Sequence, residues 1–137
     1  MKIYFDSSAF AKRFVDEDGS DEAEDILDQA TELALSVICV PEIVSALNRR
    51  KREREITSNQ YAEAKRALLD DVRDAIIVNL TVPVISSALT ALEESPLRAM
   101  DALHIACALE WGAEVFVSSD KKQLAAARQA GLTPHKI

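Results

Sequence analysis

Short apolar runs of the kind found in buried β-strands alternate along this sequence with longer helical patterns. The strand-like runs fall at residues 2–5, 34–38, 75–80, 115–118 and 134–137. The helical stretches fall at residues 7–15, 20–29, 41–54, 58–72, 84–94, 96–111 and 121–130. Parallel strands need crossover connections, which are usually helices packed on the faces of the sheet. The alternation therefore predicts an α/β/α sandwich around a mainly parallel central sheet of about five strands.

The length of the chain and the residues at its predicted helix ends fit one domain, residues 1–137. With 137 residues, of which 48% are apolar and 28% charged, the chain can bury its own core and has an ordinary globular composition. Ser20 and Ser95 are expected to cap helix starts, the latter with Pro96 in the first turn, whereas Gly112 and Gly131 fit helix C-terminal positions. No repeat, linker or low-complexity segment divides the sequence.

The two cysteines and the absence of long apolar runs bear on the compartment. Cys39 and Cys107 stand far apart in apolar surroundings and form no C-x-x-C pair, so we expect buried, reduced thiols. No apolar run approaches the ~18 residues that a membrane helix needs. We therefore expect a cytoplasmic protein that does not enter the membrane.

Two of the strand-like runs are followed by aspartates. Ligands bind to open parallel sheets in the crevice at the carboxyl ends of the strands. Asp6 directly follows the first run, and Asp120 follows the run at 115–118 after one intervening residue, Ser119. Aspartate is also a favoured helix N-cap, and capping explains either residue taken alone. Two acids at equivalent strand ends are more suggestive of a shared site.

Two further carboxylates fall near the starts of predicted helices. Glu42 follows Pro41, where the helix macrodipole stabilises a carboxylate without any function. Asp101 lies at the second turn of a helical stretch that is apolar on most faces and therefore largely buried. An unpaired carboxylate is costly there, so Asp101 should have Arg98, His104 or a bound cation as its partner.

Four segments that contain these acids resemble the successive acidic motifs of PIN-domain proteins. They are IYFDSSA at 3–9, PEIVSAL at 41–47, RAMDALHIA at 98–106 and FVSSDK at 116–121. The segments are most similar to those of the VapC toxins of type II toxin–antitoxin pairs. The resemblance extends over essentially the whole chain and keeps the family order and spacing.

The resemblance implies a PIN-like fold, a metal-dependent endoribonuclease activity, an RNA substrate, a cognate antitoxin protein and a homodimer. It matches Asp6, Glu42, Asp101 and Asp120 to the catalytic acidic set that binds Mg²⁺ or Mn²⁺. Ser8 and Ser118 match hydroxyl positions that support the first and last motifs, although capping or a turn hydrogen bond also explains each. A PIN-fold binding module and a housekeeping RNA-processing nuclease remain the alternatives.

A carboxylate cluster suits the chemistry of phosphodiester hydrolysis. Mg²⁺ and Mn²⁺ prefer oxygen ligands, and Mg²⁺ usually keeps several waters while one or two carboxylates and a substrate phosphate complete its shell. We expect an activated water to attack the phosphorus in line and to leave 5′-phosphate and 3′-hydroxyl ends. The sequence does not decide between one metal ion and two. His104 lies one turn beyond Asp101, where it either contacts the acidic cluster or, as we favour, packs within the helix; no histidine is placed as a catalytic base.

The net charge of −7 argues against a nucleic-acid partner unless positive charge gathers near the site. The densest basic run, from Arg49 to Arg54, is also explained by the preference of basic residues for helix C-termini. Arg98 and Lys121 are better placed, because they lie close in sequence to two of the proposed ligands. Arg98 is therefore the basic residue that we expect to support the site.

Other classes with acidic pockets fit less well. A receiver-type signalling domain needs a phosphoacceptor aspartate after a central strand, but the third strand-like run ends at Asn79-Leu80. A haloacid-dehalogenase-type phosphatase needs Asp-x-Asp after its first strand, where this chain has Asp6-Ser7-Ser8. The acidic run from Asp16 to Asp25 lacks the order of a calcium-binding loop and is expected to be a solvated surface.

Overall fold

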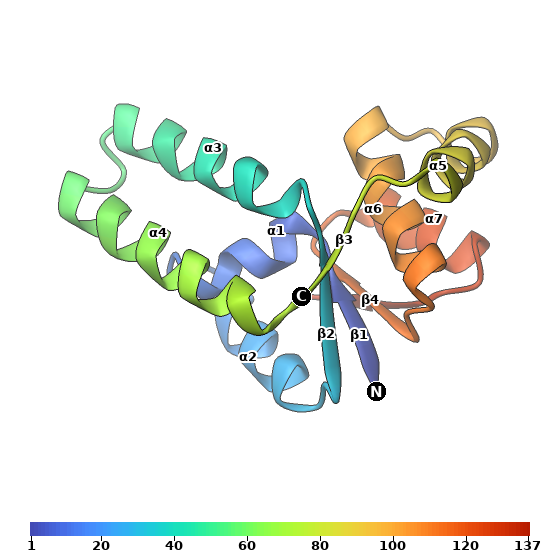
Figure 1. Cartoon of the computed structure of the whole chain (residues 1–137). Coiled ribbons are helices and arrows are strands. Elements are labelled where there is room, and N and C mark those ends of the chain that lie inside the picture. The colour runs from blue at the N-terminus through green and yellow to red at the C-terminus, as the bar shows by residue number, and fades with distance from the viewer.

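The computed structural model describes residues 1–137 and contains one five-stranded sheet with helices on both faces (Figure 1). All four pairs of neighbouring strands are parallel, and the strand order is β3-β2-β1-β4-β5. The strands are β1 (Lys2–Phe5), β2 (Glu32–Ser36), β3 (Ile76–Val78), β4 (Val115–Ser118) and β5 (Thr133–Lys136). The expected α/β/α sandwich is confirmed.

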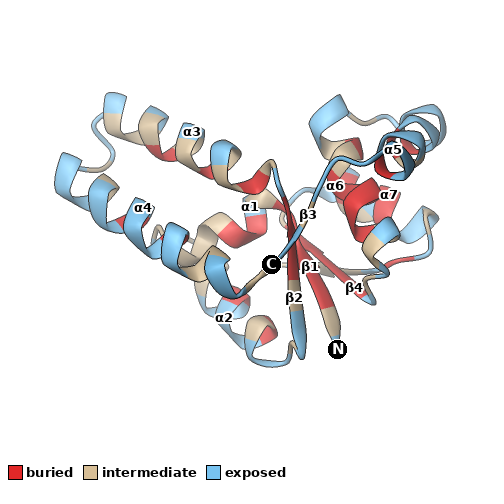
Figure 2. Cartoon of the chain, viewed as in Figure 1, coloured by how far each residue is buried: buried red, intermediate tan, exposed pale blue.

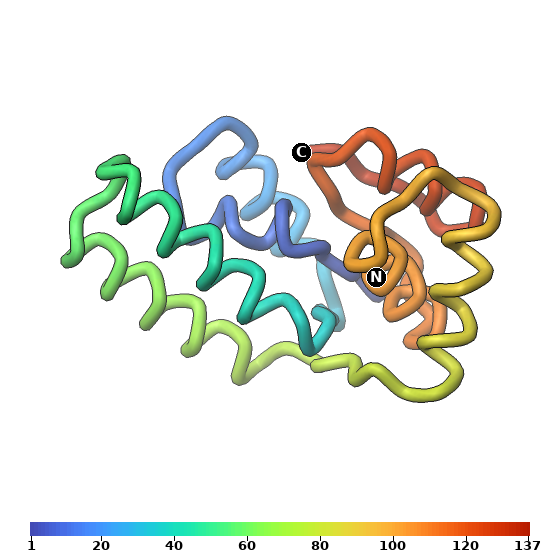
Figure 3. Tube along the Cα trace, turned by 90° about the horizontal axis from the view of Figure 1, so that it is seen from above, coloured from blue at the N-terminus to red at the C-terminus, as the bar shows by residue number.

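The helices form two layers, one on each face of the sheet. The first layer contains α1 (Ser7–Phe10), the 3₁₀ turn η1 (Ala11–Arg13), α2 (Ser20–Asp28), α3 (Cys39–Arg52) and α4 (Ser58–Asp71). The second contains α5 (Val82–Glu94), α6 (Ala99–Trp111) and α7 (Lys121–Gln129), and a second 3₁₀ turn, η2 (Val72–Asp74), precedes β3. Figure 3, seen from above, shows the layers on opposite sides of the strands.

The alternation of side chains along the strands supplies two separate cores. In β1, Ile3 and Phe5 pack against the first helical layer, whereas Tyr4 packs against the second. All three residues are fully buried, as expected for a central parallel strand that is covered on both faces (Figure 2). Cys39 and Cys107 are buried, unpaired thiols, one in each core. No helix is long and apolar enough to span a bilayer.

The start of α6 differs from the expectation. Ser95 and Pro96 do not begin the helix; Ser95 is the C-cap of α5, with extended backbone (φ −140°, ψ 149°). The following proline disfavours helical backbone at Ser95, and Leu97 then packs partly buried against the second core. The helix begins at Ala99 with Arg98 as its N-cap, so Asp101 lies in the first helical turn and not in the second.

Of the other residues expected at helix ends, Gly112 and Gly131 lie as predicted, whereas Ser20 does not cap its helix. Ser20 does not cap α2, because Gly19 occupies the N-cap in a left-handed conformation (φ 93°). The Ser20 hydroxyl instead donates to the carbonyl of Lys12 at 2.8 Å and so ties the helix to the preceding loop. Gly112 is the left-handed C-cap of α6, and Gly131 also has positive φ just beyond α7, as expected.

The strand order places a crevice between β1 and β4. From β1 the chain proceeds outward through β2 and β3, and then returns to the other side of β1 to add β4 and β5. At such a reversal the connections leave the carboxyl ends of the two central strands in opposite directions, which opens a ligand-binding crevice. Asp6 follows β1 and Asp120 follows β4, so both acids lie at this point.

Candidate active site

Asp6 forms the floor of the crevice. Its side chain is 3% exposed and caps α1 by accepting a hydrogen bond from the Ala9 N–H at 2.9 Å. The hydroxyls of Ser8 and Ser118 also donate to its two carboxylate oxygens, at 2.7 and 2.5 Å. Burial raises the pKa of Asp6, while the nearby His104 ring and these donors act in the opposite direction.

Ser118 joins the floor to the next acid along the chain. Besides donating to Asp6, its hydroxyl accepts a hydrogen bond from the Asp120 N–H at 2.9 Å. The Asp120 side chain is exposed and caps α7 by accepting from the N–H groups of Lys122 and Gln123, at 2.8 and 3.3 Å. Asp6 and Asp120 are therefore both helix N-caps, as the alternative explanation held, and both also lie at the crevice.

Glu42 reaches the crevice from the first turn of α3. One carboxylate oxygen, Oε1, accepts hydrogen bonds from the Ser7 hydroxyl at 2.7 Å and from His104 Nε2 at 2.6 Å. Burial raises the pKa of Glu42, but the hydrogen bonds from His104 and Ser7 outweigh it, so the net pKa is lowered. Glu42 is therefore held as a carboxylate.

His104 contacts the acidic set instead of merely packing within α6. Its side chain is 2% exposed and lies between the Tyr4 hydroxyl, 2.7 Å from Nδ1, and Glu42 Oε1. A carboxylate only accepts hydrogen bonds, so Nε2 carries a proton, and Tyr4 donates to Nδ1 when the ring is neutral. A buried chain from Tyr4 through His104 thus orients Glu42. Of the two interpretations of His104, the structure shows the contact with the acidic cluster and not the packing role that we favoured.

Asp101 is half-buried, and the side chain that donates to it is neither Arg98 nor His104. Its Oδ1 accepts a hydrogen bond from Gln123 Nε2 at 3.1 Å. Arg98, the N-cap of α6, forms no ion pair with it, although the two residues are three positions apart. Burial and then the negative charge of Asp120 raise the pKa of Asp101. Gln123, a buried residue of α7, was not anticipated from the sequence.

Three of the four predicted acids line one surface groove, namely Glu42, Asp101 and Asp120. Asp6 lies behind them and is linked to them through Ser118. The rim of the groove carries basic residues that make no ion pair, namely Arg98, Lys121 and Lys122. In this arrangement no three His, Cys, Asp or Glu side chains form a group that could hold a metal ion.

A second groove adjoins the first at Glu42 and runs between α1 and α3. Its lining includes Ser7, Ser8 and Ser119 near the acids and Arg49 and Arg50 at the far end. The basic run therefore faces the same side of the molecule as Glu42, although Arg50 is paired with Glu17 at 2.9 Å. The second groove therefore extends from the acidic groove along α3.

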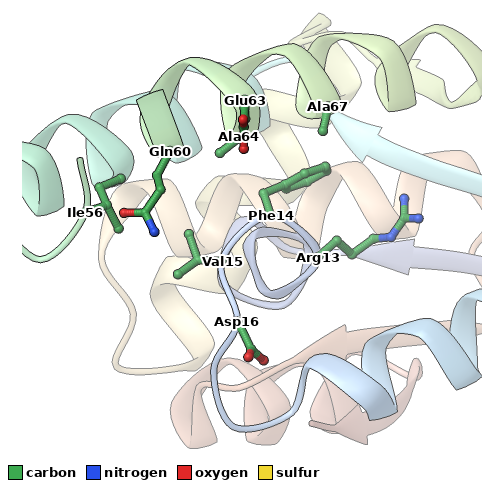
Figure 4. Close-up of a pocket in the computed structure, with 9 residues that line it drawn as sticks. All are labelled: Arg13, Phe14, Val15, Asp16, Ile56, Gln60, Glu63, Ala64 and Ala67. Carbon is green, nitrogen blue, oxygen red and sulfur yellow. The ribbon is translucent and has the colours of Figure 1, made fainter. Parts of the chain in front are cut away.

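A further pocket lies away from the acids, between η1 and α4. Figure 4 shows Phe14 and Val15 facing α4, with Arg13 and Asp16 from the same segment beside them. None of the predicted site residues lines this pocket. The four acids therefore lie at a different site, at the carboxyl ends of the strands, that shares no residue with this pocket.

The parallel sheet and its acidic crevice define a PIN domain. Residues 3–129 match the model of the PIN domain family, and the chain belongs to this family. Among its relatives is Ribonuclease VapC45 of Mycobacterium tuberculosis, which is 34% identical over 110 residues, covering 80% of this chain and 76% of VapC45. The resemblance to VapC proteins stated from the four motifs is confirmed.

Solved structures share the same architecture. Mycobacterium tuberculosis VapC20, described as a sarcin–ricin loop cleaving toxin, has a TM-score of 0.72 and 17% identity, covering 98% of this chain and 99% of VapC20. VapBC2 of Rickettsia felis, bound to a promoter DNA fragment, has a TM-score of 0.70 and 14% identity, covering 98% of both chains. At these identities the similarity establishes the fold.

Proposed function

We propose that this chain is a metal-dependent endoribonuclease and the toxin of a VapBC-type toxin–antitoxin pair. The observation that carries the proposal is that Glu42, Asp101 and Asp120 line one groove, where no basic partner neutralises Asp101 or Asp120. The ribonuclease relative at 34% identity supports the same reaction. The proposed catalytic set is Asp6, Glu42, Asp101 and Asp120.

The donor set fits Mg²⁺ or Mn²⁺ better than a softer metal. The anionic donors of the groove are all carboxylates, no histidine or cysteine lines it, and both cysteines are buried outside it. Because no three ligands converge, the arrangement suits an ion held by one or two carboxylates, with water and a substrate phosphate completing its shell. Asp101 and Asp120 are the pair whose mutual repulsion such a cation would relieve.

When bound, the ion would supply Lewis-acid stabilisation of the phosphate charge and lower the pKa of water. The protein's own part is to orient the acids. Ser7 and His104 hold one oxygen of Glu42, and Ser8 and Ser118 hold Asp6 at the floor. These contacts fix the carboxylates before the substrate arrives, which reduces the reorganisation needed during reaction.

The rim supplies the positive charge that an RNA substrate requires. Arg98, Lys121 and Lys122 surround the acidic groove and are free of ion pairs, so they are available to phosphate groups. Local positive charge of this kind compensates for the overall charge of −7. We propose that Arg98 supports the site by contacting the RNA backbone beside the scissile phosphate.

A second copy of this chain is the proposed partner of the outer face of α5. This face exposes large apolar side chains, with Val82 84% and Leu89 55% exposed, beside the open edge strand β3. No charged residue occurs from Val82 to Leu92, so two copies can meet here without the repulsion that a net charge of −7 creates elsewhere. Leu89→Glu should shift a dimer to a monomer in light-scattering chromatography, while Gln29→Glu at the C-cap of α2 should not.

The antitoxin is proposed as the second partner, supported by the VapBC2 complex among the structural relatives. Expression of the chain alone should arrest growth, and co-expression with a cognate small protein should restore it. Cleavage without growth arrest would favour a housekeeping nuclease. Metal binding without cleavage would favour a PIN-fold binding module.

The decisive experiment incubates purified protein with total cellular RNA, in Mn²⁺ and in EDTA. We compare the wild type with Asp101→Asn and with Asp28→Asn, which makes the same change at an exposed position of α2. Discrete fragments should form in Mn²⁺ with the wild type and Asp28→Asn only. Equal cleavage by all three proteins would remove Asp101 from the site.

A further inference from the structure

Gln123 is a buried polar side chain that the acidic set does not itself explain. It lies in the first turn of α7, is 2% exposed and ranks among the largest fully buried side chains of the molecule. Its neighbours on the inner face of α7 are Ala126 and Ala127, which pack into the second core. An apolar residue would fit such a position, so the amide requires a hydrogen-bonding reason.

The contacts of this amide lead to Asp101. Gln123 Nε2 donates to Asp101 Oδ1 at 3.1 Å and also lies 3.3 Å from the Asp101 carbonyl oxygen. Both partners only accept hydrogen bonds, so they fix which end of the amide faces α6. The opposite end, Oε1, faces the Ser118 hydroxyl at 3.4 Å, beneath Asp6.

Asp101 needs such a donor because no other side chain holds it. It shares its groove with the carboxylates of Glu42 and Asp120. Gln123 provides the only side-chain hydrogen bond to Asp101, and no basic residue pairs with it. Without this bond, the Asp101 carboxylate would have no side-chain partner to fix its orientation in the groove.

A neutral donor also preserves the charge of the carboxylate. Lysine or arginine at position 123 would hold Asp101 equally well but would neutralise it and compete with a cation. An amide occupies one oxygen, Oδ1, and leaves the second oxygen and the negative charge for a ligand.

We infer that Gln123 is a positioning residue that orients Asp101 toward the groove and couples α6 to the floor formed by Ser118 and Asp6. The inference rests on the proposed metal-dependent function, because it assigns Asp101 a cation to hold. Gln123 is buried and does not line the acidic groove, so it acts on the groove through Asp101.

The test compares Gln123→Met, which keeps the length of the side chain and removes the amide, with Gln129→Met. Gln129 is an exposed residue of the same helix that contacts no acid. Mn²⁺ affinity is measured by calorimetry without RNA, and RNA cleavage is measured over a range of Mn²⁺ concentrations. Thermal unfolding in EDTA reports whether each variant folds.

Gln123→Met should fold as stably as the wild type, bind Mn²⁺ about 10- to 100-fold more weakly, and recover cleavage at high Mn²⁺. Gln129→Met should match the wild type throughout. Unchanged Mn²⁺ affinity and cleavage in a folded Gln123→Met protein would overturn the inference. A wild type that binds Mn²⁺ but cleaves no RNA would refute the proposed ribonuclease, while the difference in Mn²⁺ affinity would still decide the role of Gln123.

Discussion

Asp6 and Asp101 are aspartates of the same crevice, yet their surroundings differ sharply. Asp6 is buried and accepts hydrogen bonds from one backbone N–H and two hydroxyls, so its oxygens are occupied by the protein. Asp101 is half-buried, accepts from one amide and faces Asp120 across the groove. The comparison teaches that folding already supplies the hydrogen-bond partners of Asp6, whereas Asp101 keeps its capacity for a ligand.

The largest effect should come from Asp101→Asn. We expect kcat/KM for RNA cleavage to fall by more than about 100-fold, beyond the roughly 10- to 100-fold typical of residues that only support a ligand. Unfolding in EDTA should show equal or higher stability, because the amide removes the repulsion with Asp120. A clear loss of stability in this variant would contradict the distinction between Asp6 and Asp101.

Asp6→Asn should instead lower the free energy of unfolding by about 1–3 kcal/mol, because its amide group would face hydrogen-bond donors that need an acceptor. The donors at stake are the Ala9 N–H and the Ser118 hydroxyl. Urea denaturation in EDTA measures the change. If Asp6→Asn and Asp101→Asn had the same stability, burial would not separate the two positions.

A smaller loss is expected from Ser118→Ala, of about 1–2 kcal/mol, since two hydrogen bonds disappear, one to the buried Asp6 carboxylate and one from the Asp120 N–H. Ser119→Ala removes a neighbouring hydroxyl that contacts only Ser8, at 3.2 Å, and should change stability less. The same denaturation assay ranks the two variants. The reverse order would place the structural support of Asp6 elsewhere.

The smallest effect is in the pH dependence of stability in EDTA. The raised pKa of Asp101 means that its contribution is fully present below the unfolded value of about 3.9 and is lost as pH rises through the folded value. The stability of the wild type relative to Asp101→Asn should therefore fall as the pH rises from below about 3.9.

Glu42 sharpens this contrast because its pKa is lowered. Its contribution is present above the unfolded value of about 4.3 and is lost as pH falls through the folded value. Glu42→Gln should therefore cost stability at neutral pH and cost less in acid. Urea titrations at several pH values, compared with Asp28→Asn, check both signs.

Much of the fold follows from sequence periodicity, but local packing moved some boundaries. The second strand was predicted at residues 34–38 and occurs at Glu32–Ser36. Val37 and Ile38 look strand-like, yet Ile38 is the N-cap of α3, which begins at Cys39, two residues before Pro41. Apolar residues in a tight strand-to-helix connection cannot be distinguished from strand residues by hydrophobicity.

The grouping of the four acids, with Ser8 and Ser118 beside Asp6, was predictable from motif order, whereas the contacts of Gln123 and Tyr4 were not. Gln123 lies three and four positions before Ala126 and Ala127, a helical spacing that marks an inward face. That signal was available, but a glutamine three residues after a capping aspartate is usually a solvent-exposed residue of the first helical turn. The partnership of His104 with Tyr4 joins residues 100 positions apart and depends on the tertiary fold.

The central position of β1 also sets the order in which the protein gains its activity. β1 pairs with β2 through Ile3 and Leu33, but its other edge waits for β4, where Ile3 pairs with Val115. During synthesis, the crevice is therefore incomplete until Asp120 has left the ribosome, although Asp6 and β1 emerge well before it. A nascent chain that has not yet reached Asp120 lacks the proposed nuclease site, so the ribosome that makes the protein is not exposed to the proposed activity before that point.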